Sequence, residues 1–507
     1  MRATAALPVA LAGTVVAAGA ALLATAGLVV SREMSWDLLF NLAGAWHLAN
    51  GQVANVDFHD PVGQLYFRLT QLGMWICGPT VAAFVAGNIL AAVALFAAAA
   101  VAAATRLPPV AAALFMLFPP LLVLMPANIG DDPTHFTFAM SYNDYGWATI
   151  SILCLLLFLP RRRPTAPGDW VDALVGGLLM AALYHLKITY FAAALGALGV
   201  AYLVEPHVRR PAWLVAGGLV LANAVAPWNW PYLADLAEVA ARPGAVADYL
   251  VVGHLEDLLR TSGRDQALCL LLLAMALGLF WLGRASWRLP LAVAALVVLA
   301  GALLVFNTQA RGLPLVLVAA FLLHACLRDD PVMRPLAAAP LVLPLASVLV
   351  AASSLLAYRE AAARPGDLLV VDRTNLRGLA VPAGDVPIRN GEEIDQDDYV
   401  GTILEAASLL RRTANGGQGV VVFDQVNPMP FVLGRAPRRG ARLWLDVNFP
   451  WPAPATMFAG VRHVLVPRQP TYAAVTSKAL DLYGDYLAEH FPKRTESPHW
   501  ILFSRAP

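Results

Sequence analysis

Charged residues are scarce in this chain. Among its 507 residues only 14% are charged, whereas 59% are hydrophobic. An average soluble domain carries roughly a quarter of charged residues, so the composition excludes an ordinary soluble protein. The missing charge is absent from long apolar blocks and concentrated between them. This distribution is typical of a polytopic membrane protein.

Several motifs are also missing, and each absence argues against a class of site. The four cysteines never occur at C-x-x-C spacing, which argues against a disulfide framework or a thiolate metal site. The chain contains no G-x-G-x-x-G and no P-loop, so no nucleotide site is indicated. Its net charge of +1 and the lack of a basic tract give no reason to expect a nucleic-acid partner.

The apolar blocks predict the membrane spans. A helix needs about 20 apolar residues to cross the hydrocarbon core. The first block is too long for a typical signal-peptide core, so we interpret it as an uncleaved span. About eleven spans are expected, at residues 8–30, 79–104, 107–126, 144–160, 170–187, 189–205, 212–228, 266–283, 289–306, 313–327 and 335–356.

The basic residues between the spans predict the orientation. With the N-terminus in the cytoplasm, five inside loops carry arginine, among them the run at 161–163. This bias is the positive-inside rule. The predicted outer loops are then 31–78, 127–143, 229–265 and 307–312, and the residues after 356 also lie outside.

The last 150 residues have a different character. Short runs rich in β-branched residues, such as "DLLVVD", "GVVVFD", "ARLWLD", "VRHVLVP" and "HWILFSR", alternate with helical patterns, such as "VGTILEAASLLRRTA" and "YAAVTSKALDLYGDYLAEHF". Strands that alternate with helices are typical of an α/β domain. We therefore predict a membrane domain at 1–356 and an outer α/β domain at 357–507.

Acidic residues gather in the first outer loop. Asp37 stands where the first span emerges, and residues 36–49 suit a helix in the plane of the interface. Asp57, His59 and Asp60 follow in a loop punctuated by glycine and proline, and we predict that they bind substrate. Ordinary turn chemistry explains such acids equally well.

A second acidic group, Asp131 and Asp132 with His135, occurs in the next outer loop. Two acidic clusters on separate outer loops can face one cavity. One carboxylate would then serve as a general base. The second group would hold a hard divalent cation or bind hydroxyl groups. The alternative is that outer loops simply need polar residues.

Two cations are placed to meet an anion at the same depth. Lys187 lies between two apolar runs near the outer end of its span, and Arg311 lies in a short outer turn. An ionisable residue at membrane depth is by default a functional hypothesis, and a phosphate is its natural partner. The alternatives are a snorkelling lysine and an arginine that faces headgroups. Tyr142, Asn143 and Tyr145, at the mouth of the fourth span, suit sugar faces or an aromatic belt.

Taken in order, these features resemble the GT-C superfamily of membrane glycosyltransferases, of the protein O-mannosyltransferase and lipid A aminoarabinose transferase type. The pattern there is an acid after the first span, an amphipathic helix, and a loop G-x-x-P-Y-x-D-F followed by G-P-L. Here Asp37 stands at the first acid, and "GQVANVDFHDPVGQL" keeps Gly51, Asp57 and Phe58 of the loop. Ala54-Asn55 replaces Pro-Tyr. "LKITY", "NTQARGLPL" and the acids at 131–132 look like later segments of the family.

The resemblance implies an inverting glycosyltransferase of the bacterial plasma membrane, with its C-terminal domain in the periplasm. The donor would be a sugar on polyprenyl phosphate, and the acceptor a glycan, lipid or protein of the envelope. Asp37 would be the general base. Lys187, Arg311 or a divalent cation would neutralise the leaving phosphate. No other cofactor and no partner subunit is expected, so the chain would act as a monomer. The alternatives are a polymerase or ligase of lipid-linked sugars and a transporter, although no internal repeat indicates transport.

Overall fold

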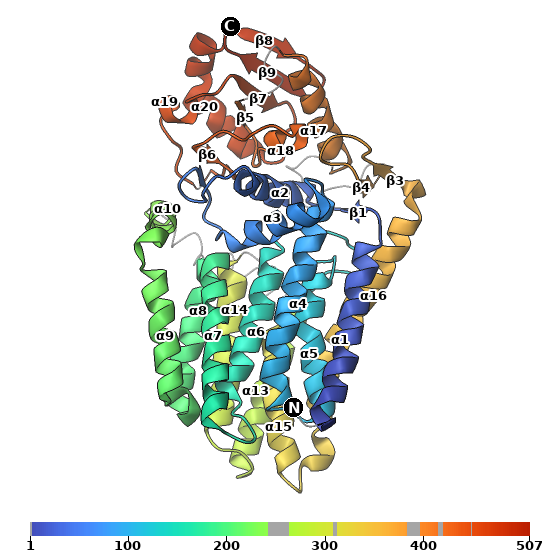
Figure 1. Cartoon of the computed structure of the whole chain (residues 1–507), viewed down its shortest axis with the longest axis vertical. Helices are drawn as coiled ribbons and strands as arrows, with labels where there is room; N and C mark the ends of the chain where they lie inside the picture. Colours follow the sequence, from blue (N-terminus) through green and yellow to red (C-terminus); the bar gives the residue numbers. More distant parts are fainter. Residues whose placement is uncertain are drawn as a thin grey trace.

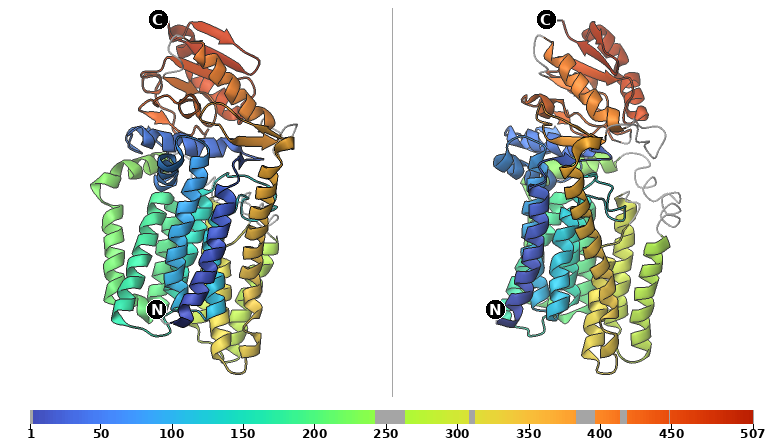
Figure 2. Two further views of the ribbon diagram at one scale, coloured as in Figure 1. Left: turned by 45° about the vertical axis from the view of Figure 1, so that its right-hand side comes forward. Right: turned by 90° about the vertical axis from the view of Figure 1, so that its right-hand side faces the viewer.

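The computed structural model describes residues 3–241, 263–307, 312–382, 396–413, 419–447 and 449–506. A long helical bundle carries a smaller α/β region on one of its ends (Figures 1 and 2). We call this end the domain end and the opposite one the basal end. The first helix begins at the basal end, and the last helix of the bundle leads up into the α/β region.

The bundle helices run up and down between the two ends (Figure 1). They are α1 (Ala3–Ala24), α4 (Ala82–Ala104), α5 (Pro109–Leu124), α6 (Tyr142–Phe158), α7 (Ala166–Leu186), α8 (Ile188–Val204), α9 (Pro211–Ala224), α13 (Gly263–Trp281), α14 (Arg288–Phe306), α15 (Val316–Asp329) and α16 (Val342–Ala363). Short 3₁₀ turns η1 (Pro206–Arg209), η2 (Pro227–Asn229), η3 (Arg334–Leu336) and η4 (Ala339–Leu341) connect some of them.

Each predicted span overlaps with a helix of the structure. Only some of these helices are long and apolar enough to cross a membrane on their own. Within the described residues six helices have the required length and apolar composition. A seventh span results if α9 is joined to α10 (Trp230–Ala240) across a bend of 54°. The 17-residue helix α6 lies inside the bundle, where neighbouring helices cover it. The chain is therefore a multi-pass membrane protein with six or seven spans by this measure, below the predicted eleven.

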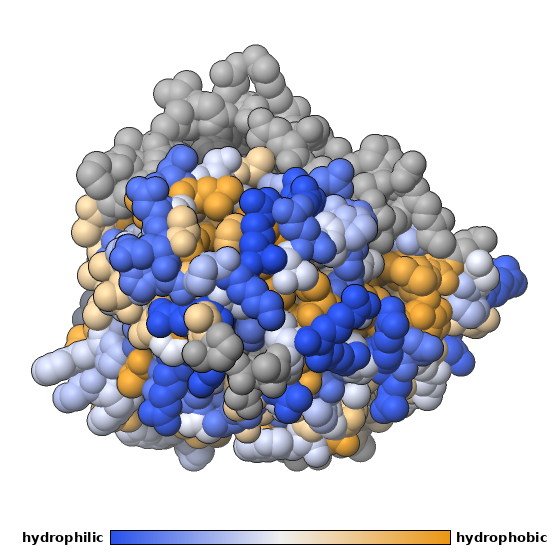
Figure 3. Space-filling model, turned by 90° about the horizontal axis from the view of Figure 1, so that it is seen from above, coloured by the Kyte–Doolittle hydropathy of each residue, from blue (hydrophilic) through white to orange (hydrophobic). Residues whose placement is uncertain are grey.

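The surface of the bundle fits a lipid environment. Large apolar side chains project outward from many helices, among them Leu178, Leu219 and Leu349, each about 60% exposed. Exposed tryptophans mark both ends, with Trp228 at the domain end and Trp281 at the basal end. Such belts are typical of the two membrane interfaces. The far face of the α/β region, in contrast, is mainly hydrophilic (Figure 3).

The end of the first span was predicted wrongly. The apolar block continues to residue 30, but α1 ends at Ala24 and Gly27 adopts a φ of +78°. Glycine tolerates this left-handed conformation. The next apolar residues form strand β1 (Val29–Val30), which pairs with β4 (Leu379–Pro382) of the α/β region. Apolarity therefore marks burial here, and not continued crossing of the membrane.

Two helices lie across the domain end of the bundle, α2 (Ser35–Ala49) and α3 (Leu65–Cys77) (Figure 1). The sequence predicted the first of them correctly as a helix in the interface plane. Almost all residues of α2 are buried, however, because the α/β region covers it. The indole of Trp46 donates to the carbonyl of Arg435 at 2.8 Å, and the ring of Trp36 packs edge-on against Tyr399. The α2 helix is thus clamped between the two parts of the molecule.

The α/β region is built on a four-stranded sheet of order β5-β7-β9-β8. Its strands are β5 (Val420–Val422), β7 (His463–Pro467), β8 (Lys493–Glu496) and β9 (Trp500–Ser504), with β5 and β7 parallel. The helices are α17 (Gln396–Arg411), α18 (Met429–Leu433), α19 (Pro454–Met457) and α20 (Ala473–His490), and turn η5 (Pro365–Asp367) follows α16. The predicted alternation of strands and helices is confirmed.

Two smaller sheets join this region to the membrane part. In one, β1 pairs with β4, which pairs in turn with β3 (Leu368–Val370). In the other, β2 (Phe58–His59) pairs in parallel with β6 (Ala441–Arg442). The segment between α1 and α4 is therefore held by main-chain hydrogen bonds to the C-terminal region.

A buried ion cluster fixes the basal end. The carboxylate of Asp172 on α7 accepts hydrogen bonds from the guanidinium groups of Arg106 and Arg161, and the side chain of Arg106 is completely buried. We expect Asp172→Ala to lower the free energy of unfolding by about 3–5 kcal/mol, because two cations lose their partner. Thermal unfolding of the detergent-solubilised protein measures this.

The matched control for Asp172 is Asp169→Ala, which breaks the partly exposed pair between Asp169 and Arg210. Exposed pairs contribute about 0–1 kcal/mol. Equal losses of stability in the two variants would contradict the role of burial.

Candidate functional site at the domain end

Asp37 lies in the first turn of α2 and forms hydrogen bonds with two residues, Met34 and Met140, whose backbones are strained. Its carboxylate accepts a hydrogen bond from the backbone N–H of Met140 at 3.0 Å, and its own N–H donates to the carbonyl of Met34. Met34 and Met140 have φ angles of 52° and 49°, in the left-handed region. Such strain costs about 1–3 kcal/mol per residue and collects at functional sites. Asp37 is 7% exposed.

Two tyrosines connect the surroundings of Asp37 with Lys187. Tyr66 of α3 is buried, and its ring packs edge-on against Tyr142 with 5.4 Å between the centroids. The ammonium of Lys187 lies over the ring of Tyr142 at 4.5 Å from its centroid. Burial raises the pKa of the Tyr66 phenol, and the nearby carboxylates of Asp37 and Asp144 raise it further. A carboxylate and a cation thus flank one pair of aromatic rings.

Lys187 stands in the break between α7 and α8, where the chain has an extended conformation. The loop between α2 and α3 packs directly against this break. The N–H of Gly63 donates to the carbonyl of Leu186 at 2.9 Å, and a Cβ at Gly63 would lie 2.1 Å from the carbonyl oxygen of His185. Only glycine permits this approach. It brings Asp60 close to Lys187.

Asp60 and Lys187 influence each other across this contact. Burial raises the pKa of Asp60 to about 8, and the Lys187 ammonium opposes the rise. Burial lowers the pKa of Lys187 to about 7, with Asp60 acting in the opposite direction. One oxygen of Asp60 accepts from the N–H of Val62 at 2.7 Å. The other is buried and has no hydrogen-bond partner among the described residues. The pair is therefore poised to receive a further polar group.

The other polar residues of this loop form contacts with α10 and with the α/β region. The ring nitrogen of His59 lies 3.0 Å from the carboxylate of Asp235 on α10, and Asn55 donates to the same carboxylate at 2.8 Å. Asp57 pairs with Arg439 of the α/β region at 3.3 Å and accepts from the N–H of Val53. The structure thus brings His59 and Asp60 to one corner of the site, whereas Asp57 holds the loop against the C-terminal region.

Asn143 and Tyr145 face the interior of the bundle. Both are at least 96% buried in the first turn of α6. The hydroxyl of Tyr145 donates to the amide oxygen of Asn88 on α4, and the hydroxyl of Tyr190 on α8 donates to Asn143. These contacts join three helices and occupy the polar atoms. Of the three predicted sugar-binding residues, Tyr142 alone is seen next to the cation.

The second acidic group does not form a ready cation site. One oxygen of Asp132 accepts from both the N–H and the hydroxyl of Thr134, and the ring of His135 lies 3.7 Å from Glu33. Nowhere in the described ranges do three histidine, cysteine or acidic side chains gather closely enough to hold a metal. Asp131 is half-buried in the same loop. The predicted cation stays a prediction, and no step below uses it.

Arg311 lies outside the described residues, as do residues 242–262 of the predicted outer loop at 229–265. Two acids that the sequence analysis did not select belong to the site. Asp144 is buried near Tyr66 and makes no hydrogen bond to the described part of the chain. Asp235 joins through α10. Asp144 falls within a segment that the sequence had marked, but no local pattern distinguishes Asp235.

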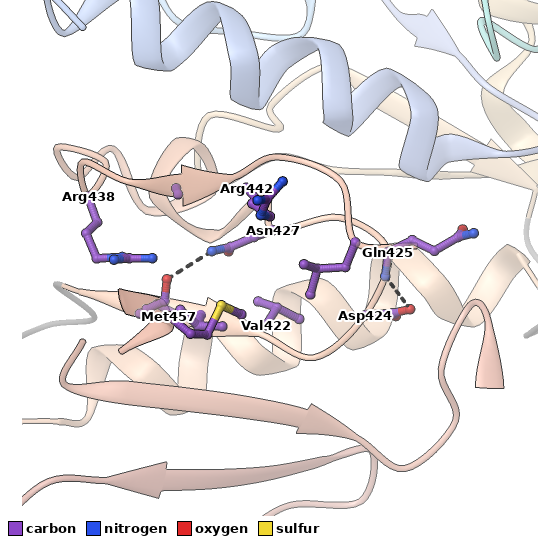
Figure 4. A pocket seen from close by; sticks show the side chains of 11 residues that line it. Val422, Asp424, Gln425, Asn427, Arg438, Arg442 and Met457 are labelled. Atoms are coloured by element: carbon purple, nitrogen blue, oxygen red, sulfur yellow. Dashed lines mark hydrogen bonds between the residues drawn. The ribbon is translucent and has the colours of Figure 1, made fainter. Parts of the chain in front are cut away.

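The α/β region has a small cavity of its own (Figure 4). It lies beside β5 and is lined by Asp424, Gln425, Asn427, Arg438 and Arg442. Its volume of about 20 Å³ fits one water molecule. Arg442 also pairs with Glu238 on α10 at 3.0 Å. This cavity therefore belongs to the joint between the α/β region and α10, and it is too small for a sugar.

The tight contact at Gly63 provides a test of the site. We expect Gly63→Ala to push the loop away from the α7–α8 break and to weaken ligand binding at Lys187 at least tenfold. Gly199→Ala on α8 is the control, because the added methyl group there meets open space. Isothermal titration with a short-chain prenyl phosphate measures both variants. Equal affinities would show that the position of the loop does not matter.

Comparison with known protein families and with curated protein sequences finds no match for this chain.

Proposed function

We propose that the chain is an inverting glycosyltransferase that moves a sugar from a polyprenyl phosphate to an acceptor at the cell envelope. The observation that carries the proposal is that the Asp37 carboxylate, which acts on Tyr66, and the Lys187 ammonium, which lies over Tyr142, flank the edge-on pair of Tyr66 and Tyr142 rings. Both groups lie at the domain end of a membrane bundle. At this end of the bundle, a phosphate attached to a membrane lipid can meet an acceptor that comes from the aqueous phase.

The chemistry needs one base and one positive charge. Asp37 takes the proton from an acceptor hydroxyl while the acceptor oxygen attacks the anomeric carbon of the sugar. The new bond forms on the face opposite the phosphate, and the old bond between sugar and phosphate oxygen breaks. The configuration of the sugar is inverted. Prenyl phosphate leaves with the bonding electrons, and Lys187 stabilises its charge.

The orientation of the chain supports the same proposal. Arginines 106, 161–163, 209–210, 284, 288, 328 and 334 all lie in or next to turns at the basal end (Figure 1). By the positive-inside rule this end faces the cytoplasm. The candidate site then faces the outside, which in a bacterium is the periplasm, and the lipid-linked donor is taken from the outer leaflet.

Mass analysis of envelope glycans tests the proposed function in the organism that encodes the chain. A deletion strain should lack one sugar substituent, and a plasmid copy of the gene should restore it. An unchanged glycan profile would contradict sugar transfer. Loss of uptake of a solute, with all glycans intact, would favour a transporter. Loss of long polymers with intact repeat units would favour a polymerase or ligase.

A further inference from the structure

A second site lies at the basal end, far from Asp37 and Lys187. A cavity of about 560 Å³ opens between the lower ends of α6, α8 and α15 and the start of α14. Its volume is that of a small-molecule site. Phe158, Leu289 and Leu322 contribute apolar walls, whereas Glu205 and Arg288 contribute charge. The cavity is therefore amphiphilic.

Glu205 is the unusual member of this cavity. It follows the last turn of α8, is only 8% exposed, and its side chain makes no hydrogen bond to the described part of the chain. One ring nitrogen of His207 lies 3.7 Å from the Glu205 carboxylate and is itself buried without a hydrogen-bond partner among the described residues. Burial lowers the pKa of the His207 ring, which favours its neutral form. A buried carboxylate in this condition is costly. Burial raises the pKa of Glu205 accordingly.

The charges of the cavity fit a ligand with two opposite charges. Arg284 pairs with Asp330 at 3.4 Å. Arg288 lines the same cavity as Glu205, and its positive charge opposes the rise that burial causes in the pKa of the Glu205 carboxyl. The exposed Trp281 and Trp287 stand at the end of α13 and just before α14, at the same basal end of the bundle, where tryptophans are typical of the headgroup level. Besides the Arg284–Asp330 pair, the cavity therefore offers the cation of Arg288 and the acids Glu205 and Asp329, with an apolar floor at the basal end of the bundle.

We propose that this cavity binds one aminophospholipid through its phosphoethanolamine headgroup. The phosphate lies on the guanidinium of Arg288, and the primary ammonium donates hydrogen bonds to the carboxylate of Glu205. The glycerol and the first methylene groups cover Phe158, Leu289 and Leu322. The lipid fills the space between four helices and joins α8 to α14. This inference does not depend on the proposed sugar transfer.

Native mass spectrometry of the purified, delipidated full chain tests the site. We expect phosphatidylethanolamine to bind at least tenfold more tightly than phosphatidylglycerol, which has no ammonium, and than phosphatidylcholine, whose ammonium has no N–H. Glu205→Gln and Arg288→Gln should each weaken binding of phosphatidylethanolamine about tenfold. Arg163→Gln, at an exposed arginine outside the cavity, should not change it.

Two further measurements distinguish a bound lipid from a bound headgroup and guard against a variant that fails to fold. Soluble glycerophosphoethanolamine should bind far more weakly than the lipid, and equal binding would contradict a lipid occupant. Arg288 is exposed, so its variant is expected to fold and carries the test if Glu205→Gln does not. Equal affinities for the three lipids, or unchanged binding by Arg288→Gln, would overturn the proposal.

Discussion

Asp37→Asn should abolish sugar transfer almost completely, with a rate about 10²–10⁴-fold below that of the native chain. The amide still accepts the hydrogen bond from the N–H of Met140, so the strained turn has no reason to relax. The amide cannot take a proton, however. The loss should therefore appear in kcat, with little change in the KM for the lipid-linked donor. Membranes supplied with a radiolabelled donor and an envelope fraction as acceptor measure both constants.

A nearby acid provides the control for this result. Glu33→Gln removes a carboxylate four residues before Asp37 that lies on the side of His135. We expect its rate to stay within about twofold of the native one. Asp37→Glu, which keeps a carboxylate at a longer reach, should recover part of the activity. A rate for Asp37→Asn that matches the native chain would remove Asp37 as the base.

Lys187→Ala has the second largest expected effect. A hydrogen bond to a charged group contributes about 1.5–3 kcal/mol, which corresponds to a loss of donor affinity of roughly 10- to 150-fold. Lys187→Arg keeps the charge and should lose much less. The N–H and carbonyl contacts of Lys187 in the α7–α8 break do not involve the side chain, so both variants should fold. Titration calorimetry with a short-chain prenyl-phosphate sugar measures the donor affinity of each variant.

The same cation predicts a pH dependence of binding. The Lys187 ammonium, with a pKa of about 7, is charged below that pH and loses its proton above it. Asp60, with a pKa of about 8, becomes an anion as the pH rises further. Both changes make the site less positive, while the phosphodiester of the donor keeps its charge. Affinity should therefore fall steadily between pH 6.5 and 9.

The Lys187→Arg variant should show a flatter pH profile, because arginine stays charged over this whole range. An affinity of the native chain that is constant from pH 6.5 to 9 would mean that neither side chain meets the donor phosphate.

The sequence predicted those parts of the fold that depend on local patterns. Apolar blocks gave the bundle helices, and the periodicity of 36–49 gave α2. Alternation of strands and helices gave the α/β region. The two-residue strands β1 and β2 escaped prediction, because their partners β4 and β6 lie hundreds of residues away. For the same reason the burial of α2 beneath the α/β region was not foreseen.

The residues of the candidate site also fall into those that a local sequence pattern marks and those that depend on tertiary packing. Lys187 was recognisable because a charge inside an apolar run is rare, and Asp37 because it follows the first apolar block. The corner formed by Asp60 and Asp235 depends on how α10 packs on the first loop, which no local pattern encodes. Asn143 and Tyr145 looked like sugar contacts in the sequence. Their polar atoms meet other helices, because α6 lies deep in the bundle.

Photo-crosslinking tests the central claim most directly. Purified full chain is irradiated with a polyprenyl phosphate that carries a diazirine close to the phosphate, and the labelled peptides are identified by mass spectrometry. The account predicts label on the α7–α8 break around Lys187 and on the segment that contains Tyr142, and an excess of unlabelled prenyl-phosphate sugar should suppress it. Label that falls only on the basal end or on the outer faces of the helices, and that resists competition, would contradict the account.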